Sequence, residues 1–311
     1  MVGIVSTIAG CLILGFDWSV DDLAVFFGAR HMSPPLSFNV FTTPEKAVIA
    51  ERPRPFGPPM AWDPTTSTLI FGENDAVLVD TLTTIAEAEA LADWVRLHHR
   101  NLSTIYITHG HIDHYAGLSV LLQRFPNARA IATPRSVELA HAQLPRLPGY
   151  RKLFSGQLPP AITLPEPYNS DTLTLEGHEL RIIEQGQTDA PDSTSLHIPS
   201  IDLVVAGDVV YNECHMFVGA TTPESRRNWI AALDRLAALH PSTVVAGHKR
   251  PGAPDTPVAI GATKRYLHDF GRLQESTTSD RELYDAMTKL YPDWVSHQAW
   301  LMFGLAPATT Q

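Results

Sequence analysis

The chain has 311 residues, of which 44% are hydrophobic and 18% charged, an ordinary globular composition that suffices for one large domain or two smaller ones. A net charge of −10 without a basic cluster argues against nucleic acid as a main partner. Cys11 and Cys214 are the only cysteines, too few for a disulfide framework or a Cys-rich zinc site, so a reducing, cytoplasmic compartment is the simpler expectation.

The first 32 residues are predicted to form an extension, and residues 33–311 a single domain. The apolar run from Val2 to Phe16 is too short to span a bilayer comfortably and lacks the basic start of a secretory signal, so stable membrane insertion is not expected. Three interpretations stay open: an unprocessed or mis-assigned upstream extension, an extra packing helix, or a targeting segment. In the first case the natural protein would begin at Met32.

From Ser37 onward, short β-branched and apolar runs alternate with turn residues and predict strands. The strands expected in the first half are 38–42, 47–50, the hairpin 67–72 and 75–80, and 102–107. A helix is expected over 85–99, with Thr83 or Thr84 as its cap. The loop 52–64 contains too many prolines for a central strand, and it either walls a substrate pocket or crosses the surface.

Three imidazoles and a carboxylate lie within six consecutive positions directly after strand 102–107. They are His109, His111, Asp113 and His114, and helical spacing of apolar residues follows them. Four such side chains would be costly to bury together without a cation, and their nitrogen and oxygen donors suit zinc or a similar first-row metal. The stretch therefore predicts a metal site where a strand gives way to a helix.

The second half continues the alternation of strands and helices. It is interrupted by the irregular insertion 144–169, which is expected to be a lid or pocket wall rather than a second domain. The expected elements are strand 128–132, a helix from Pro134, the hairpin 173–175 and 179–184, strands 194–198, 201–208 and 242–248, a helix over 223–239, and helices from Val258 that break near Gly271 and Pro292. This order favours two sheets with helices on their outer faces.

Two of these strands end in the same pattern, Ala206-Gly207-Asp208 and Ala246-Gly247-His248. A glycine before a ligand-type residue lets the backbone approach a site closely. Asp208 and His248 therefore join the candidate metal ligands. Ordinary Gly-Asp and Gly-His turns are the alternative, which the repetition of the pattern disfavours.

The His-x-His-x-Asp-His motif, followed by Gly-Asp and Gly-His at strand ends, resembles the zinc-hydrolase branch of the metallo-β-lactamase superfamily. The resemblance implies an α/β fold, the four-layer αβ/βα sandwich of that superfamily. It also implies a binuclear metal centre with a defined division of ligands. In that division, His109 and His111 bind the first metal, Asp113, His114 and His248 bind the second, and Asp208 bridges the two.

One position departs from the resemblance, because the family usually has Gly-His-Thr where this chain has Gly186-Gln187-Thr188. A glutamine carbonyl is a neutral, weak oxygen donor, so Gln187 is a doubtful ligand and the first metal would keep three protein ligands and a water. We therefore expect one or two Zn²⁺ ions, with the first site weakened. The glutamine is a natural retuning, a decayed site or an engineered inactivating change, and all three remain open.

The resemblance implies an enzyme, a hydrolase in which a metal-bound hydroxide attacks a small carbonyl substrate: a lactone, lactam, ester or thioester. Asp113 would orient the nucleophile and take up its proton. His215, seven residues after Asp208, is a candidate proton donor or substrate contact, with a surface position as the alternative. Two other functions stay open: hydrolysis of a phosphodiester metabolite and, because of Gln187, binding of a small metabolite without turnover. The motifs do not indicate the oligomeric state.

Overall fold

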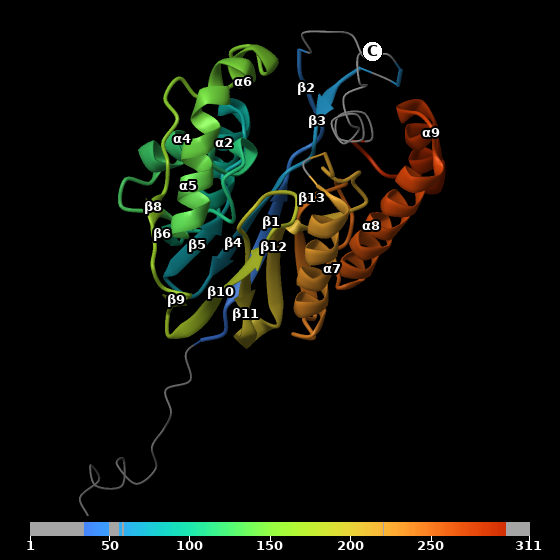
Figure 1. Cartoon of the computed structure of the whole chain (residues 1–311). Coiled ribbons are helices and arrows are strands. Elements are labelled where there is room, and N and C mark those ends of the chain that lie inside the picture. Colours follow the sequence, from blue (N-terminus) through green and yellow to red (C-terminus); the bar gives the residue numbers. More distant parts are fainter. Residues whose placement is uncertain (1–33, 50–55, 58, 220, 297–311) are drawn as a thin grey trace, which may run out of the picture. The chain divides into compact units, whose positions relative to one another are not determined.

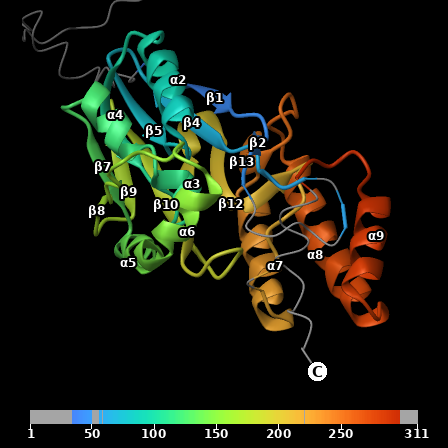
Figure 2. The same cartoon turned by 90° about the horizontal axis from the view of Figure 1, so that it is seen from above.

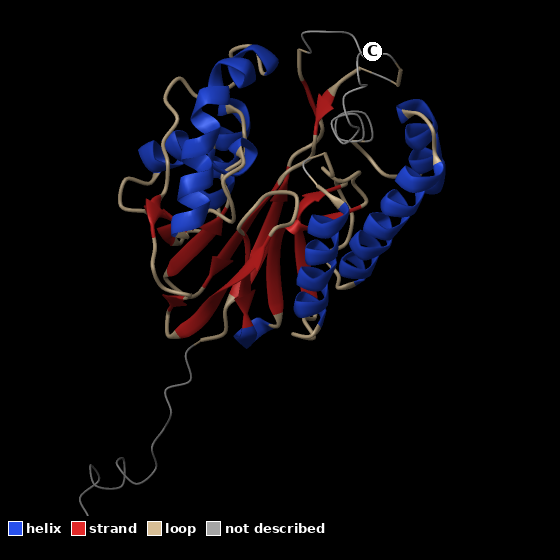
Figure 3. Ribbon diagram, in the orientation of Figure 1, coloured by secondary structure: helices blue, strands red, loops and turns tan. Residues whose placement is uncertain are grey.

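The computed structural model describes residues 34–49, 56–57, 59–219 and 221–296. They form two β-sheets that pack face to face, with helices on both outer faces (Figure 1, Figure 3). This architecture confirms the predicted four-layer αβ/βα sandwich. The predicted extension, residues 1–32, lies outside the described residues, and among the described helices none is long and apolar enough to cross a membrane.

The first sheet has six strands and mixed topology. Its order is β1 (Ser37–Thr42), β4 (Thr66–Phe71), β5 (Asp75–Val79), β6 (Asn101–Tyr106), β7 (Arg129–Ala132) and β8 (Glu166–Pro167). The strands from β5 to β8 pair in parallel, whereas β1, β4 and β5 pair antiparallel. Parallel neighbours need crossovers, which here contain α2 (Ile85–Arg96), α4 (Leu118–Arg124) and α5 (Pro134–Gln143).

The second sheet has five strands, in the order β13 (Thr243–Lys249), β12 (Leu203–Asn212), β11 (Ser193–Ile198), β10 (His178–Gly186) and β9 (Thr172–Leu175). Its one parallel pair, β12 with β13, is connected through α7 (Pro223–Ala237). The helices α8 (Val258–Ser276) and α9 (Asp280–Leu290) follow and lie on the same side as α7, opposite the helices of the first sheet (Figure 2). The remaining elements are the pair β2 (Lys46–Ala47) and β3 (Ala61–Trp62), the short helices α3 (Ile112–Tyr115) and α6 (Leu147–Leu153), and 3₁₀ turns at Leu144–Arg146 and Pro199–Ile201.

Three apolar cores fill the three spaces between the four layers, because successive strand residues point to opposite faces of a sheet. In β5, Val77 and Val79 face the space between the sheets, whereas Leu78 packs beneath the helices of its own sheet. In β12, Val205 faces the other sheet and Val204 packs against α7 and α8. Because the two sheets pack against each other, the ends of their strands keep fixed relative positions. Residues from both sheets can therefore form one site.

Several predicted boundaries are wrong. The strand predicted over 47–50 is described only as Lys46–Ala47, and the helix predicted over 85–99 ends at Arg96. The C-terminal helix α8 does not break near Gly271 but runs to Ser276, since one glycine costs a helix only about 1 kcal/mol. The break comes instead at 277–279, where Ser279 caps α9. The strand predicted to end at Asp208 continues to Asn212, and its pairing with β13 is irregular between Val205 and Tyr211.

Candidate metal centre

The candidate ligands come from both sheets. The turn between β6 and α3 carries His109 and His111, and the first turn of α3 carries Asp113 and His114. Asp208 comes from the irregular part of β12, and His248 from β13 of the same sheet. All six predicted ligands are thereby brought together, in two groups whose donor atoms lie within 4.8 Å of one another inside each group.

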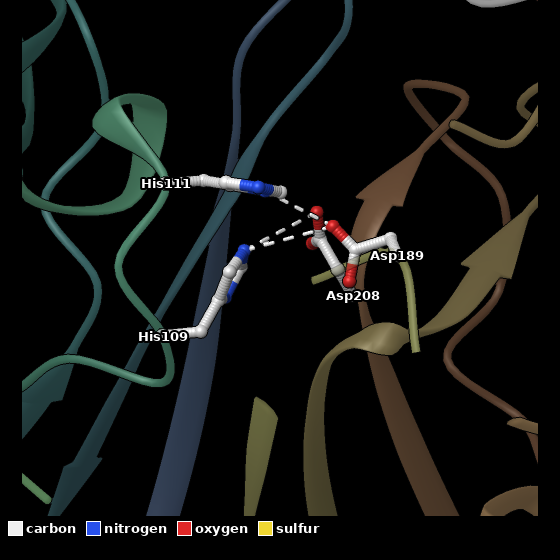
Figure 4. A group of neighbouring side chains, drawn as sticks. All are labelled: His109, His111, Asp189 and Asp208. Atoms are coloured by element: carbon white, nitrogen blue, oxygen red, sulfur yellow. Dashed lines mark ion pairs between the residues drawn. The ribbon is translucent and has the colours of Figure 1, made fainter. Parts of the chain in front are cut away.

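The first group contains His109, His111, Asp208 and a residue not predicted from the sequence, Asp189. Figure 4 shows the two imidazoles pointing toward the two carboxylates across the space between their chain segments. The Oδ2 atom of Asp189 lies 3.0 Å from Nδ1 of His111 and 3.8 Å from Nε2 of His109. The Nε2 atom of His109 also lies 3.7 Å from Oδ2 of Asp208.

The second group contains Asp113, His114 and His248. The Oδ2 atom of Asp113 lies 3.4 Å from Nε2 of His248 and 3.9 Å from Nε2 of His114. Asp208 reaches this group as well, with Oδ1 3.3 Å from His114 Nε2 and Oδ2 3.1 Å from His248 Nε2. Its carboxylate therefore lies between the two groups, as expected for a bridging ligand.

Several buried polar atoms at the centre are left without a hydrogen bond by the described residues. Four side-chain atoms there have no hydrogen-bond partner in the described part of the chain: His109 Nε2, His114 Nε2, Asp189 Oδ2 and Asp208 Oδ1. Buried polar atoms are costly unless hydrogen bonds or cations satisfy them. Imidazole nitrogens and carboxylate oxygens converging in this way fit divalent first-row metal ions.

Two imidazoles are oriented by hydrogen bonds from Nδ1, the ring nitrogen that points away from the centre. Nδ1 of His114 donates to Oδ2 of Asp80 at 2.8 Å, and Nδ1 of His248 donates to the Pro64 carbonyl at 2.9 Å. Because these oxygens only accept, Nδ1 carries a proton, and in the neutral form of each ring the lone pair of Nε2 faces the centre. Asp80 also accepts from Thr108 N and Oγ1, which fixes the start of the motif.

Electrostatics at the centre favours positive charge. Burial alone would lower the pKa of His248, but Asp208 and Asp113 outweigh it and raise that pKa to about 9. Burial would likewise raise the pKa of Asp208, yet His248 and His114 hold it well below its usual range. In the absence of metal, protons on His114 and His248 thus offset the carboxylates, a role that a bound cation would take over, whereas burial lowers the pKa of His109.

Two glycines permit the close approach of β12 to its neighbours. Gly207 has φ +56°, and a Cβ there would lie 3.1 Å from the Thr108 side chain. A Cβ on Gly247 would lie 2.0 Å from Asp208 Oδ1 and 2.7 Å from the Gly207 carbonyl carbon. Gly247 therefore leaves room for the Asp208 carboxylate and Gly207 for Thr108, a close approach that the repeated Ala-Gly pattern suggested.

A cavity of about 380 Å³ opens beside both groups, which is within the range of small-molecule sites. Besides the ligands, its wall is largely apolar and aromatic, formed by Trp62, Ile112, Tyr150, Leu153 and Phe217. Arg146 is the one arginine or lysine among its described lining residues. The proline-rich loop and the insertion 144–169 thus both contribute to the wall, through Trp62 and through Arg146, Tyr150 and Leu153.

The family model of the metallo-beta-lactamase superfamily matches residues 60–248, more than half of the chain. The chain belongs to the metallo-beta-lactamase superfamily. It is therefore an enzyme of a metal-dependent hydrolase family.

Two curated relatives are similar to this superfamily member over most of the domain. A type 2 metallo-beta-lactamase from Bacteroides fragilis is 24% identical over 212 residues, which cover 67% of this chain and 76% of that protein. A hydroxyacylglutathione hydrolase from Parasynechococcus marenigrum (strain WH8102) is 27% identical over 183 residues, 55% of this chain and 60% of that protein.

Solved structures of the superfamily share the fold. A metallo-beta-lactamase family protein from Thermus thermophilus aligns with a TM-score of 0.56 and 19% identity, covering 86% of this chain and 91% of that one. A metallo-beta-lactamase from Pontibacter korlensis aligns with a TM-score of 0.54 and 16% identity, covering 77% and 98%. At these identities, the likeness supports the architecture alone.

Two predicted site residues of this metallo-beta-lactamase-fold enzyme lie elsewhere. The Gln187 amide donates to the Thr188 carbonyl at 3.1 Å, and Gln187 is only partly buried and is not among the described residues that line the cavity. His215 is fully buried among aromatic rings, with Nδ1 3.0 Å from the Tyr266 hydroxyl, and it is not among the residues that line the cavity. Neither the doubtful ligand role nor the proton-donor role is supported by these positions.

Asp189 is the residue that sequence reasoning missed. A carboxylate two positions after the unusual glutamine was visible in the sequence, but so was Asp192 in the same loop. The structure distinguishes them, because the Asp189 side chain is fully buried at the centre whereas Asp192 is partly exposed and lies near Arg135. Spacing alone could not decide which of the two points inward.

Proposed function

We propose that this protein is a binuclear, metal-dependent hydrolase of a small carbonyl substrate: a lactone, lactam, ester or thioester. The observation that carries the proposal is the pair of adjoining ligand groups, joined by Asp208, on the wall of a largely apolar cavity. Zinc is the proposed metal, since mixed imidazole and carboxylate donors suit it.

The residues that would hold the metals are His109, His111, Asp189 and Asp208 in one group, and Asp113, His114, His248 and Asp208 in the other. When bound, the ions would supply a Lewis acid for the substrate oxygen and an acidified water as nucleophile. No serine or cysteine nucleophile is then required.

The protein's own part of the chemistry is to orient groups and to move protons. The indole of Trp62 donates to Oδ2 of Asp113 at 3.1 Å, which holds this carboxylate in place to orient the nucleophile and take up its proton. The hydroxyl of Tyr211 donates to Oδ2 of Asp208 at 3.2 Å and lies on the cavity wall. Burial and the Asp208 charge raise the pKa of Tyr211, so the phenol keeps its proton at neutral pH and continues to hold the Asp208 carboxylate.

The cavity wall suggests what the substrate carries. Its aromatic and aliphatic side chains suit an apolar acyl or ring substituent. Arg146 and Gln143 lie on the wall formed by the end of α5 and the following turn, where a carboxylate on the substrate would meet a cation. The names of the two curated relatives add weight to the lactam and thioester classes within this proposal.

Metal analysis and turnover test the proposal together. Protein purified without chelator is expected to hold about two equivalents of metal and to hydrolyse members of a panel of lactones, lactams, esters and thioesters. Metal content near zero with no turnover would instead support a metabolite-binding protein. Turnover confined to a phosphodiester metabolite, assayed beside the panel, would support the other alternative function.

Arg146 is tested within the same panel, using substrate pairs that differ only in a carboxylate. Arg146→Ala should raise KM about 10- to 100-fold for the carboxylate-bearing member, the value of a charged hydrogen bond, and leave its partner unchanged. The control is Arg129→Ala, which removes an exposed arginine that pairs with Glu166 on β8. Equal effects on both members of each pair would contradict a carboxylate-binding role.

A further inference from the structure

The Asp189 carboxylate is held so that one oxygen is satisfied and the other faces the metal ligands. Its Oδ1 atom accepts a hydrogen bond from Thr188 Oγ1 at 2.9 Å. Its Oδ2 atom has no hydrogen-bond partner among the described residues and lies 3.0 Å from Nδ1 of His111. The side chain is fully buried, so bulk water does not satisfy this oxygen.

The backbone before Asp189 explains why this residue, and not Gln187, points inward. Strand β10 ends in a bulge between Glu184 and Gly186, and Gly186 has φ +71°. The following turn is closed by a hydrogen bond from Thr188 N to the Ala190 carbonyl at 2.9 Å. The Gln187 amide faces the Thr188 carbonyl, and the side chain two residues later, that of Asp189, enters the centre.

The Asp189 turn is also anchored to the neighbouring strand. Thr188 Oγ1, whose one proton goes to Asp189, also lies 2.7 Å from Ser193 Oγ, and Ser193 Oγ donates to the Ala190 carbonyl at 3.3 Å. Ser193 begins β11, so these bonds tie the turn to the second sheet. These bonds hold the Asp189 side chain in position before a metal binds.

We infer that Asp189 takes the place of the third imidazole of the first metal site, so that both sites of this enzyme have the same donor set. Each then has two imidazoles, one terminal carboxylate and a share of Asp208. The inference rests on the proposed function, since it presupposes a binuclear centre. It leaves Gln187 without a role as a ligand and makes the first site complete.

The exchange also changes the charge of the centre. Two divalent ions bring four positive charges, and Asp113, Asp189 and Asp208 cancel three of them, whereas a third histidine would leave two uncancelled. The added carboxylate makes the first site harder, which favours ions that prefer oxygen, such as Mn²⁺, relative to a site with three imidazoles and a share of Asp208. With matched donors, the two sites should fill together during a titration rather than in two separate steps.

The direct test measures metal content, not activity, in Zn²⁺- and Mn²⁺-loaded protein after dialysis. The expected content is about two equivalents for the natural chain and about one for Asp189→Asn, because an amide is a much weaker donor. Asp189→His should keep two equivalents of Zn²⁺ but lose Mn²⁺ from the first site. Gln187→His should leave both metal contents unchanged, since the Gln187 amide is bonded to the Thr188 carbonyl and residue 187 is not among the described residues that line the cavity.

The matched control is Asp192→Asn, which removes a carboxylate from the same loop outside the ligand groups and should keep two equivalents. Circular dichroism checks that every variant is folded, and Asp189→His serves as the second variant if Asp189→Asn is not. Natural protein that binds no metal would overturn the proposed function itself. Two equivalents in both the natural chain and folded Asp189→Asn would overturn only the assignment of Asp189, as would Zn²⁺ gained through Gln187→His.

Discussion

Gly247→Ala is the sharpest test of how the two sheets build the centre. The new Cβ would lie 2.0 Å from Asp208 Oδ1, 2.7 Å from the Gly207 carbonyl carbon and 2.9 Å from Asp208 N. Carbon–oxygen contacts normally begin near about 3.3 Å, so the carboxylate must move by roughly 1 Å. Two of the three contacts are with backbone, so a change of side-chain rotamer does not relieve them.

The expected result is loss of metal together with a modest loss of stability. Overpacking a filled interior costs about 1–3 kcal/mol, and a displacement of about 1 Å at a reacting centre costs on the order of 100-fold in rate. Metal content, melting temperature and turnover should all fall in Gly247→Ala. Because Asp208 adjoins both ligand groups, we expect both metals to be affected rather than one.

The control is Gly261→Ala in α8, where the nearest atom to a new Cβ is the flexible end of Arg265 at 3.5 Å. Alanine should stabilise this helix position by up to about 1 kcal/mol, because glycine is the weaker helix former. The reasoning is refuted if Gly247→Ala keeps its metal content and melts at or above the temperature of Gly261→Ala.

Three further predictions follow from other contacts. Asp80→Asn replaces the anionic acceptor of His114 Nδ1, so metal affinity should fall about 10- to 100-fold in competition with a chromogenic chelator; an unchanged affinity would contradict the orienting role. Removing metal with a chelator should lower the melting temperature, since free metal at 100 times its Kd stabilises the fold by about 2.7 kcal/mol per site; identical melting curves would exclude a tightly bound metal. The backbone amides of Asp75, Asn74 and Glu73 lower the pKa of Glu176, so its stabilising effect is present above its unfolded value of 4.5 and lost as pH falls through the lower folded value. Glu176→Gln should therefore flatten the acid side of the stability profile, and identical acid limbs for both proteins would refute this.

Most of the centre could be predicted because its ligands are local in sequence. His109, His111, Asp113 and His114 occupy one turn and the start of one short helix, so their proximity needs only the β6-to-α3 connection. Asp208 and His248 could be predicted because neighbouring parallel strands carry them at the same end of the sheet. The layer order followed from the alternation of strand and helix patterns.

The cavity wall could not be predicted in this way, because it depends on contacts between distant segments. Trp62 reaches Asp113 across 51 positions, and Tyr150 meets Trp62 with ring centroids 6.3 Å apart. No local pattern specifies such a contact, because it depends on how two irregular segments pack over the finished sheets. His215 shows the converse, since its short separation from Asp208 along the chain does not bring it among the described residues that line the cavity.

The position of Asp189 shows why a missing motif residue need not mean a missing ligand. Two residues of extended chain span up to about 7 Å, so moving a donor by two positions would normally take it out of a metal site. Here the bulge at Gly186 and the closed turn at Thr188 shorten that path and bring the later side chain to the same centre. The requirement at the centre is for a donor atom at a place in space, and the loop satisfies it with a carboxylate where a histidine is usual. A sequence motif therefore indicates where in the chain a ligand usually lies. The buried Nε2 of His109, which has no hydrogen-bond partner among the described residues, indicates that the centre requires a cation and its ligands.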